Sequence, residues 1–172
     1  MITLRKLALD HPDIPKVWKL FREAFHESES ELLSSLLEFP EATLYGIYPN
    51  ALSHKFIGFF VVLDDGSVAF MYYFAICPEM RSAGIGGEAL RALVEMCRGR
   101  QVTLLYESVR QPGDDAEQRE RRRAFYLRNG FHESSEYYSY EDTEYVLAGS
   151  EEPVDTDAVL RLFSRYEGEL FA

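Results

Sequence analysis

The chain has 172 residues, 47% of them hydrophobic and 27% charged, with a net charge of −11 at neutral pH. This composition is typical of one globular domain over residues 1–172, and such an acidic surface repels nucleic acid. The longest apolar run, around Phe56–Leu63, is too short to cross a bilayer, and the N-terminus MITLRKLALD has no signal-peptide core. Cys77 and Cys97 are too few for a disulfide scaffold. We therefore expect a cytoplasmic protein without nucleic-acid or membrane partners.

The first half of the chain predicts a strand, two helices and three strands. Apolar and polar residues alternate in ITLRKLAL, as in a half-buried strand, and apolar residues then recur at helical spacing after Asp13, a candidate N-cap. A short helix is expected over Glu29–Leu37. The strands that follow are rich in Val, Ile, Phe and Tyr and are expected over Thr43–Tyr48, Lys55–Leu63 and Val68–Ile76.

The second half predicts helix, strand, helix, two strands and a terminal helix. An amphipathic helix ends near Gly99, and a strand over Val102–Glu107 follows it. The next helix is expected from Asp115 to Asn129. Asp115 and Gln118 resemble a capping box at its start, and Gly130 lies beyond its end. The last elements are strands over His132–Tyr140 and Glu144–Ala148 and a helix with an apolar face of Val159, Leu162, Phe163, Tyr166 and Leu170. This order indicates the α/β class with a mixed sheet, antiparallel in front and with a strand–helix–strand crossover behind.

Three glycines lie within four positions of RSAGIGGEAL, Arg81–Leu90, between a predicted strand and a predicted helix. The first amides of a helix have no partner within it, and the helix dipole favours an anion there. Glycines let a phosphate approach without a Cβ in the way. The spacing matches neither a Walker loop nor a dinucleotide fingerprint, and a simple tight turn is the alternative.

The wider context of these glycines is more specific. The run Arg81-Ser82-Ala83-Gly84-Ile85-Gly86 follows Pro78, and RRAFYLRNGF follows at Arg122–Phe131. The first block resembles the acetyl-CoA signature of the GNAT acetyltransferase superfamily, and the second is similar to its Tyr-x-x-x-Gly-Phe element. The resemblance implies a GNAT-like fold of about seven strands with splayed fourth and fifth strands, and an N-acetyltransferase that uses acetyl-CoA and no metal.

The same resemblance implies roles for individual residues. Pantetheine would enter the splay like an extra strand, and backbone amides after the fourth strand would hold the pyrophosphate. The implied cofactor-binding residues are Ala75, Ile76, Arg81, Ser82, Ala83, Gly84, Ile85, Gly86 and Gly87. Tyr126 aligns with the tyrosine that protonates the departing thiolate.

The general base is less directly indicated. Many relatives carry a glutamate on the fourth strand, where this chain has Tyr72. Glu107, at the end of the fifth strand, is the candidate base, with a structural strand-end carboxylate as the alternative. Glu27 and Glu29 either line the acceptor pocket and attract a cation or are simply solvated. The basic run Arg119–Arg123 is expected to be a solvated helix face paired with nearby acids.

The sequence thus predicts transfer of an acetyl group from acetyl-CoA to a primary amine by direct attack in a ternary complex. The acceptor is a small-molecule or peptide amine, whose identity the sequence does not give. The alternative is a catalytically silent acyl-CoA-binding regulatory module. A homodimer is left open.

Overall fold

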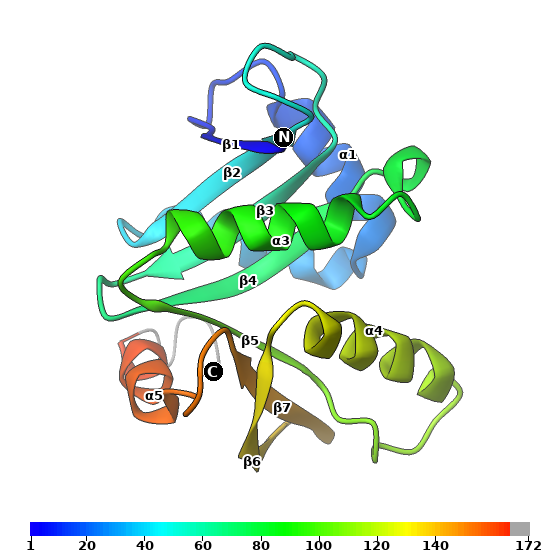
Figure 1. Ribbon diagram of the computed structural model, residues 1–172, viewed down its shortest axis with the longest axis vertical. Helices are drawn as coiled ribbons and strands as arrows, with labels where there is room; N and C mark the ends of the chain where they lie inside the picture. The colour runs from blue at the N-terminus through cyan, green and yellow to red at the C-terminus, as the bar shows by residue number, and fades with distance from the viewer. Residues whose placement is uncertain (166–172) are drawn as a thin grey trace.

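The computed structural model describes residues 1–165, which form one seven-stranded sheet in the order β1-β2-β3-β4-β5-β7-β6 (Figure 1). The strands are β1 (Thr3–Lys6), β2 (Ala42–Tyr48), β3 (Gly58–Asp64), β4 (Val68–Ile76), β5 (Gln101–Glu107), β6 (His132–Tyr140) and β7 (Thr143–Gly149). All neighbouring strands are antiparallel except β4 and β5, which are parallel and joined through a helix. The predicted mixed sheet is therefore confirmed.

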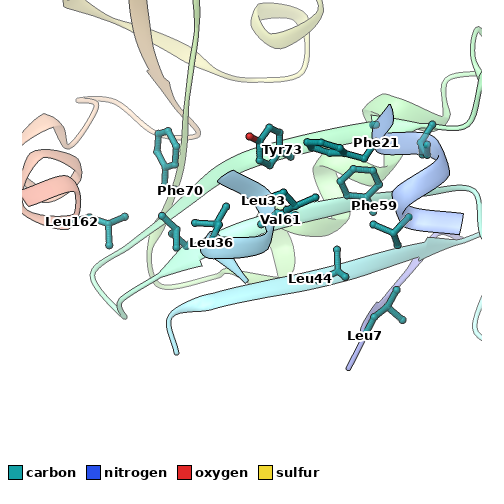
Figure 2. Packing of buried hydrophobic residues seen from close by; sticks show 14 of the residues in the cluster. Leu7, Phe21, Leu33, Leu36, Leu44, Phe59, Val61, Phe70, Tyr73 and Leu162 are labelled. Carbon is teal, nitrogen blue, oxygen red and sulfur yellow. The ribbon is translucent and has the colours of Figure 1, made fainter. Parts of the chain in front are cut away.

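Helices cover both faces of this sheet. They are α1 (Ile14–Ala24), α2 (Ser30–Leu36), α3 (Ile85–Met96), α4 (Ala116–Arg128) and α5 (Thr156–Ser164), with 3₁₀ turns at Glu27–Glu29 and Pro78–Met80. Successive side chains of β3 alternate between the faces: Phe59 packs with α1 and α2, while Phe60 packs with α3. Figure 2 shows the first of these two cores, where Leu33 and Leu36 meet Phe21 and Val61.

The predicted N-cap positions of two helices are confirmed, but their side-chain capping bonds are not formed. Asp13 and Asp115 occupy N-cap positions, but neither side chain caps its helix. Asp13 instead accepts a hydrogen bond of 2.5 Å from the hydroxyl of Tyr48, because this buried hydroxyl needs an acceptor within the core. Of the predicted terminal face, Tyr166 and Leu170 lie outside the described residues.

The β4–β5 pair opens after three residues. Val68–Phe70 pair with Gln101–Thr103, and the Thr103 hydroxyl donates to the carbonyl of Ala69 at 3.3 Å. Beyond this point β4 continues to Ile76 without a neighbouring strand on that side within residues 1–165, while β5 continues along β7. The splay between the fourth and fifth strands is therefore confirmed, and its open end is where the predicted site residues gather.

A bulge in β4 sets the direction of two tyrosines. Tyr73 pairs with Val61 and Met71 with Val62, so Tyr72 is the additional residue between them. In a regular strand two consecutive side chains lie on opposite faces. Here Tyr72 and Tyr73 both pack against the core of α1 and α2, because the extra residue shifts the alternation.

Candidate active site

A cavity of about 610 Å³ lies in the splay. Its walls come from the end of α1 and the start of α2, from β4 and β5, from α4, from β6 and β7, and from α5. Both predicted catalytic residues, Glu107 and Tyr126, line it. The structure therefore brings together two side chains that are 19 positions apart in the sequence (126 − 107).

The glycine-rich loop offers unused backbone donors beside this cavity. Within the described residues, the amides of Ser82 to Gly87 make no hydrogen bond, and the first helical bond of α3 runs from the amide of Glu88 to the carbonyl of Gly84. Arg81 to Gly84 are exposed. Gly84 has a φ of +77°, a left-handed conformation that favours glycine. The loop has the unpaired amides and the dipole that an anion requires.

The three glycines of the loop have different physical requirements. A Cβ on Gly84 would meet no atom within 4 Å, so glycine is needed there for its backbone conformation. A Cβ on Gly86 would lie 3.4 Å from the ring of Phe125. A Cβ on Gly87 would lie 2.6 Å from Oδ1 of Asn129, so this glycine allows α3 to pack against the end of α4.

The open edge of β4 begins next to this loop. The amide of Cys77 donates to the carbonyl of Ile57 on the β3 side, and a Cβ on Gly58 would lie 2.5 Å from the carbonyl oxygen of Ala75. Because main-chain groups alternate along an antiparallel strand, those of Ala75 face β3, while those of Phe74 and Ile76 face the gap. Phe74 thus replaces Ala75 as the residue suited to an incoming strand.

Arg81 is attached to the same edge. Its Nε donates to the carbonyl of Ile76 at 3.0 Å, which ties the loop back to the end of β4. The side chain therefore has a structural contact as well as a charge beside the exposed amides.

Tyr126 is held on all sides by aromatic rings. It stacks on Tyr106 with ring centroids 5.5 Å apart and 7° between the planes, and it meets Phe125 and Phe131 edge-on. Burial raises the pKa of the Tyr126 phenol, with Arg122 opposing the shift. The hydroxyl makes no hydrogen bond within residues 1–165. The phenol therefore stays protonated, with its proton free for a group that enters the cavity.

A polar network holds the ring of Tyr106, on which Tyr126 stacks. The Tyr106 hydroxyl donates to Glu133 at 2.8 Å, and the guanidinium of Arg123 binds both oxygens of the same carboxylate at 2.9 to 3.0 Å. Burial, followed by the Glu133 carboxylate, raises the pKa of Tyr106. Tyr106 is thus held in place to support the ring of Tyr126, and its own hydroxyl is bonded to Glu133.

Glu107 lies opposite a buried arginine. Nη1 of Arg119 is 3.6 Å from its carboxylate, and Nη2 of Arg119 donates to the carbonyl of Gln111 in the loop that precedes α4. The arginine side chain is 6% exposed and that of Glu107 is 37% exposed. The carboxylate is therefore fixed on one side and open to the cavity on the other.

The prediction of a solvated face for Arg119–Arg123 is only partly correct. Arg121 is exposed and pairs with Glu117 four positions earlier. Arg119 is buried, Arg122 lines the cavity and Arg123 binds Glu133. The charge run conceals these roles because it has no apolar periodicity that would indicate which side faces inward.

The wall opposite α4 is rich in tyrosine. Glu29 lines the cavity, whereas Glu27 is exposed and does not. Rings from three strands surround this part of the cavity: Tyr72, Tyr73, Tyr138, Tyr140 and Tyr145. Sequence reasoning assigned no function to the tyrosines of β6 and β7, and their alternation in the strand was the only signal.

The sequence model of the acetyltransferase (GNAT) family matches residues 14–131. The chain belongs to the GNAT acetyltransferase family. It is therefore an acyltransferase, and the family match covers both the glycine-rich loop and the Tyr126 block. No curated protein matches the sequence significantly.

Solved structures share the GNAT fold. A GNAT-family protein from Bacteroides thetaiotaomicron has 21% identity over 98% of both chains, with a TM-score of 0.76. A ribosomal-protein alanine N-acetyltransferase from Escherichia coli has 20% identity over 87% of this chain and 92% of that chain, with a TM-score of 0.60. A Bacillus subtilis acetyltransferase in complex with CoA has 10% identity over 87% of this chain and 97% of that chain, with a TM-score of 0.62.

Among the described residues, no group of three or more His, Cys, Asp or Glu side chains is arranged to hold a metal ion. None of the helices within residues 1–165 has the length and apolar character needed to cross a membrane.

Proposed function

We propose that this GNAT protein transfers the acetyl group of acetyl-CoA to a primary amine by direct attack in a ternary complex. The observation that supports this most is the cavity of the β4–β5 splay, because Glu107 and Tyr126 both line it beside the unused amides of Ser82 to Gly87. The CoA complex of the Bacillus subtilis relative supports the choice of donor.

The donor would occupy the open edge of β4. The main-chain groups of Phe74 and the amide of Ile76 would bind pantetheine as a neighbouring strand would, and the amides of Ser82 to Gly87 would bind the pyrophosphate. Arg81 would add a positive charge at the junction of the two.

The chemistry would then need two protein groups. The neutral amine attacks the thioester carbonyl, the new carbon–nitrogen bond forms, and the carbon–sulfur bond breaks. Glu107 accepts the proton that the amine nitrogen loses, directly or through a water. Tyr126 gives its proton to the departing thiolate and regains one through solvent, so that the products are the acetylated amine and CoA with a free thiol.

The test is amine-dependent release of the CoA thiol, with the acetylated product identified by mass spectrometry. Direct attack predicts that incubation with acetyl-CoA alone leaves the mass of the protein unchanged. It also predicts intersecting initial-rate patterns when both substrates are varied. Tight binding of acetyl-CoA without thiol release for any amine of a broad panel would favour the regulatory module instead.

A further inference from the structure

Glu29 and Glu107 are carboxylates that line the cavity, and they differ in their surroundings. Within residues 1–165 Glu29 takes part in no ion pair, whereas Glu107 faces Arg119 at 3.6 Å. Burial raises the pKa of the Glu29 carboxyl, against smaller opposing effects of Tyr73 and His26. A carboxylate in this position has lost part of its hydration, and no lysine or arginine in the described part of the chain forms an ion pair with it.

Tyr73, whose pKa is raised by burial and by the nearby Glu29 carboxylate, belongs to the same part of the cavity wall. Its side chain is 4% exposed, and its buried hydroxyl has no hydrogen-bond partner among the described residues. The ring packs edge-on against Phe21 at 5.1 Å, and in Figure 2 the hydroxyl oxygen points away from that ring. Buried polar groups normally have partners, so an unpartnered hydroxyl in a cavity wall indicates a ligand group.

The cavity that Glu29 lines is also lined by aromatic rings that a cation could contact. The β4 bulge places Tyr72 beside Tyr73, with centroids 5.0 Å apart. On the next wall Tyr138 lies opposite Tyr145 in the β6–β7 register, and Tyr140 follows two positions later on the same face. Aromatic faces attract cations, most strongly where water is partly excluded.

The two carboxylates lie on different parts of the cavity wall. Glu107 comes from the end of β5, and Glu29 from the segment between α1 and α2. Tyr145 is within electrostatic reach of both, which together with burial raises its pKa. Arg122, which also lines the cavity, acts on the Tyr126 phenol. Because the proposed function assigns the attacking nitrogen to Glu107 and Tyr126, Glu29 is left for another group of the acceptor.

We propose that Glu29 and the tyrosines around it bind a second positive charge on the acceptor, so that the preferred acceptors are primary amines carrying a further cationic group. The inference rests on the proposed function and specifies its substrate class. Both a small diamine and a basic peptide have this chemistry. The nearby Glu27, exposed and outside the cavity, provides a matched control for the loss of one negative charge.

The kinetic experiment compares acceptors in matched pairs. Butylamine is compared with putrescine, and alanyl-alaninamide with alanyl-lysinamide, by release of the CoA thiol. A charge-assisted contact predicts that the doubly cationic member of at least one pair has a kcat/KM about tenfold higher, mainly through KM. Glu29→Gln should reduce this ratio about tenfold, while Glu27→Gln preserves it. The pair with the larger ratio identifies the source as a small amine or a peptide.

A binding experiment separates this inference from the proposed function. Calorimetry measures binding of putrescine and of alanyl-lysinamide to the CoA-saturated protein and to its Glu29→Gln variant. Glu29-dependent binding without CoA release for any amine would refute the transferase proposal and support the cation site. Transfer with equal kcat/KM within both pairs, and with ratios unchanged by Glu29→Gln, would overturn the cation site and leave the transferase proposal intact.

Discussion

The ring of Tyr126 lies flat on the ring of Tyr106, with 5.5 Å between centroids and 7° between planes. The hydroxyl of Tyr106 is bound to Glu133, whereas that of Tyr126 reaches the cavity without a partner in residues 1–165. Tyr106 therefore positions the ring of Tyr126, while Tyr126 keeps a hydroxyl proton that it can donate to a ligand.

Tyr126→Phe removes the free hydroxyl and keeps the stacked ring. Loss of a general acid lowers rates by about 10²–10⁴-fold, so we expect a fall of that size in kcat, near-normal acetyl-CoA affinity and a weakened basic limb of the pH–rate profile. The loss should shrink with a thioester whose thiol leaves more readily. Tyr137→Phe is the control, because Tyr137 packs against Arg110 outside the cavity. Wild-type turnover of Tyr126→Phe would make Tyr126 a structural residue.

Glu107→Gln keeps the shape of the side chain and an oxygen for Arg119 but removes the base. We expect kcat to fall by about 10²-fold or more, with little change in acetyl-CoA affinity and with loss of the acidic limb of the pH–rate profile. Glu117→Gln, on the exposed first turn of α4, should leave the profile unchanged. An intact acidic limb in Glu107→Gln would assign proton removal to another group.

Gly84→Glu should abolish acetyl-CoA binding, because its carboxylate would lie where the pyrophosphate is proposed to bind. The left-handed backbone adds a cost of about 1–2 kcal/mol to stability. Gly66→Glu is a close control: Gly66 also has a positive φ, of +88°, with no atom within 4 Å of an added Cβ, in the turn between β3 and β4. Both variants should lose similar thermal stability. If calorimetry shows that folded Gly84→Glu binds acetyl-CoA with normal affinity, the loop does not bind the pyrophosphate.

Gly87→Ala tests the packing role assigned to the third glycine. The added methyl would lie 2.6 Å from Oδ1 of Asn129, which accepts from Arg91 at 3.0 Å. Overpacking of this kind costs about 1–3 kcal/mol, of which the higher helix propensity of alanine within α3 returns up to about 1 kcal/mol, and urea unfolding of the ligand-free protein measures the net loss. Adding Asn129→Ala should recover part of the loss. Unchanged stability of Gly87→Ala would contradict the packing role.

Glu29→Gln should raise thermal stability while it weakens acceptor selection. Burial raises the pKa of this carboxyl above its ordinary value of 4.5, so ionisation opposes folding. At low pH the group is protonated in both the folded and unfolded states, and the variant has no advantage. The melting temperature of the variant should exceed that of the wild type increasingly as pH rises from 4.5 through the raised pKa. A gain that grows toward low pH would be inconsistent with this account.

The order of elements and the splay could be predicted from the sequence. Apolar periodicity fixed the strands and helices, and the blocks at Arg81 and Tyr126 placed them in the family. Glu107 could be proposed because it ends a predicted strand beside the splay. These features depend on local patterns, which a single sequence displays directly.

Other features depend on contacts between distant segments. Strict alternation would place Tyr72 and Tyr73 on opposite faces, and only the pairing with β3 reveals the bulge that brings them together. Arg119 looks solvated within its charge run, but its partners come from β5 and the following loop. Asp13 occupies the predicted N-cap position, but its carboxylate binds Tyr48, 35 positions away, in place of a helix amide. Tertiary partners of this kind leave no periodic signal.

The short parallel seam between β4 and β5 has a consequence for amide hydrogen exchange. Along the last part of β4, the amide of Cys77 is bonded to β3, whereas those of Phe74 and Ile76 face the gap. Protection should therefore alternate from one residue to the next in the ligand-free protein, with rapid exchange at the gap-facing positions. A donor lying along β4 would slow exchange at those positions alone and convert the alternating pattern into a continuous one. Such a measurement would report, residue by residue, where the acyl carrier meets the strand.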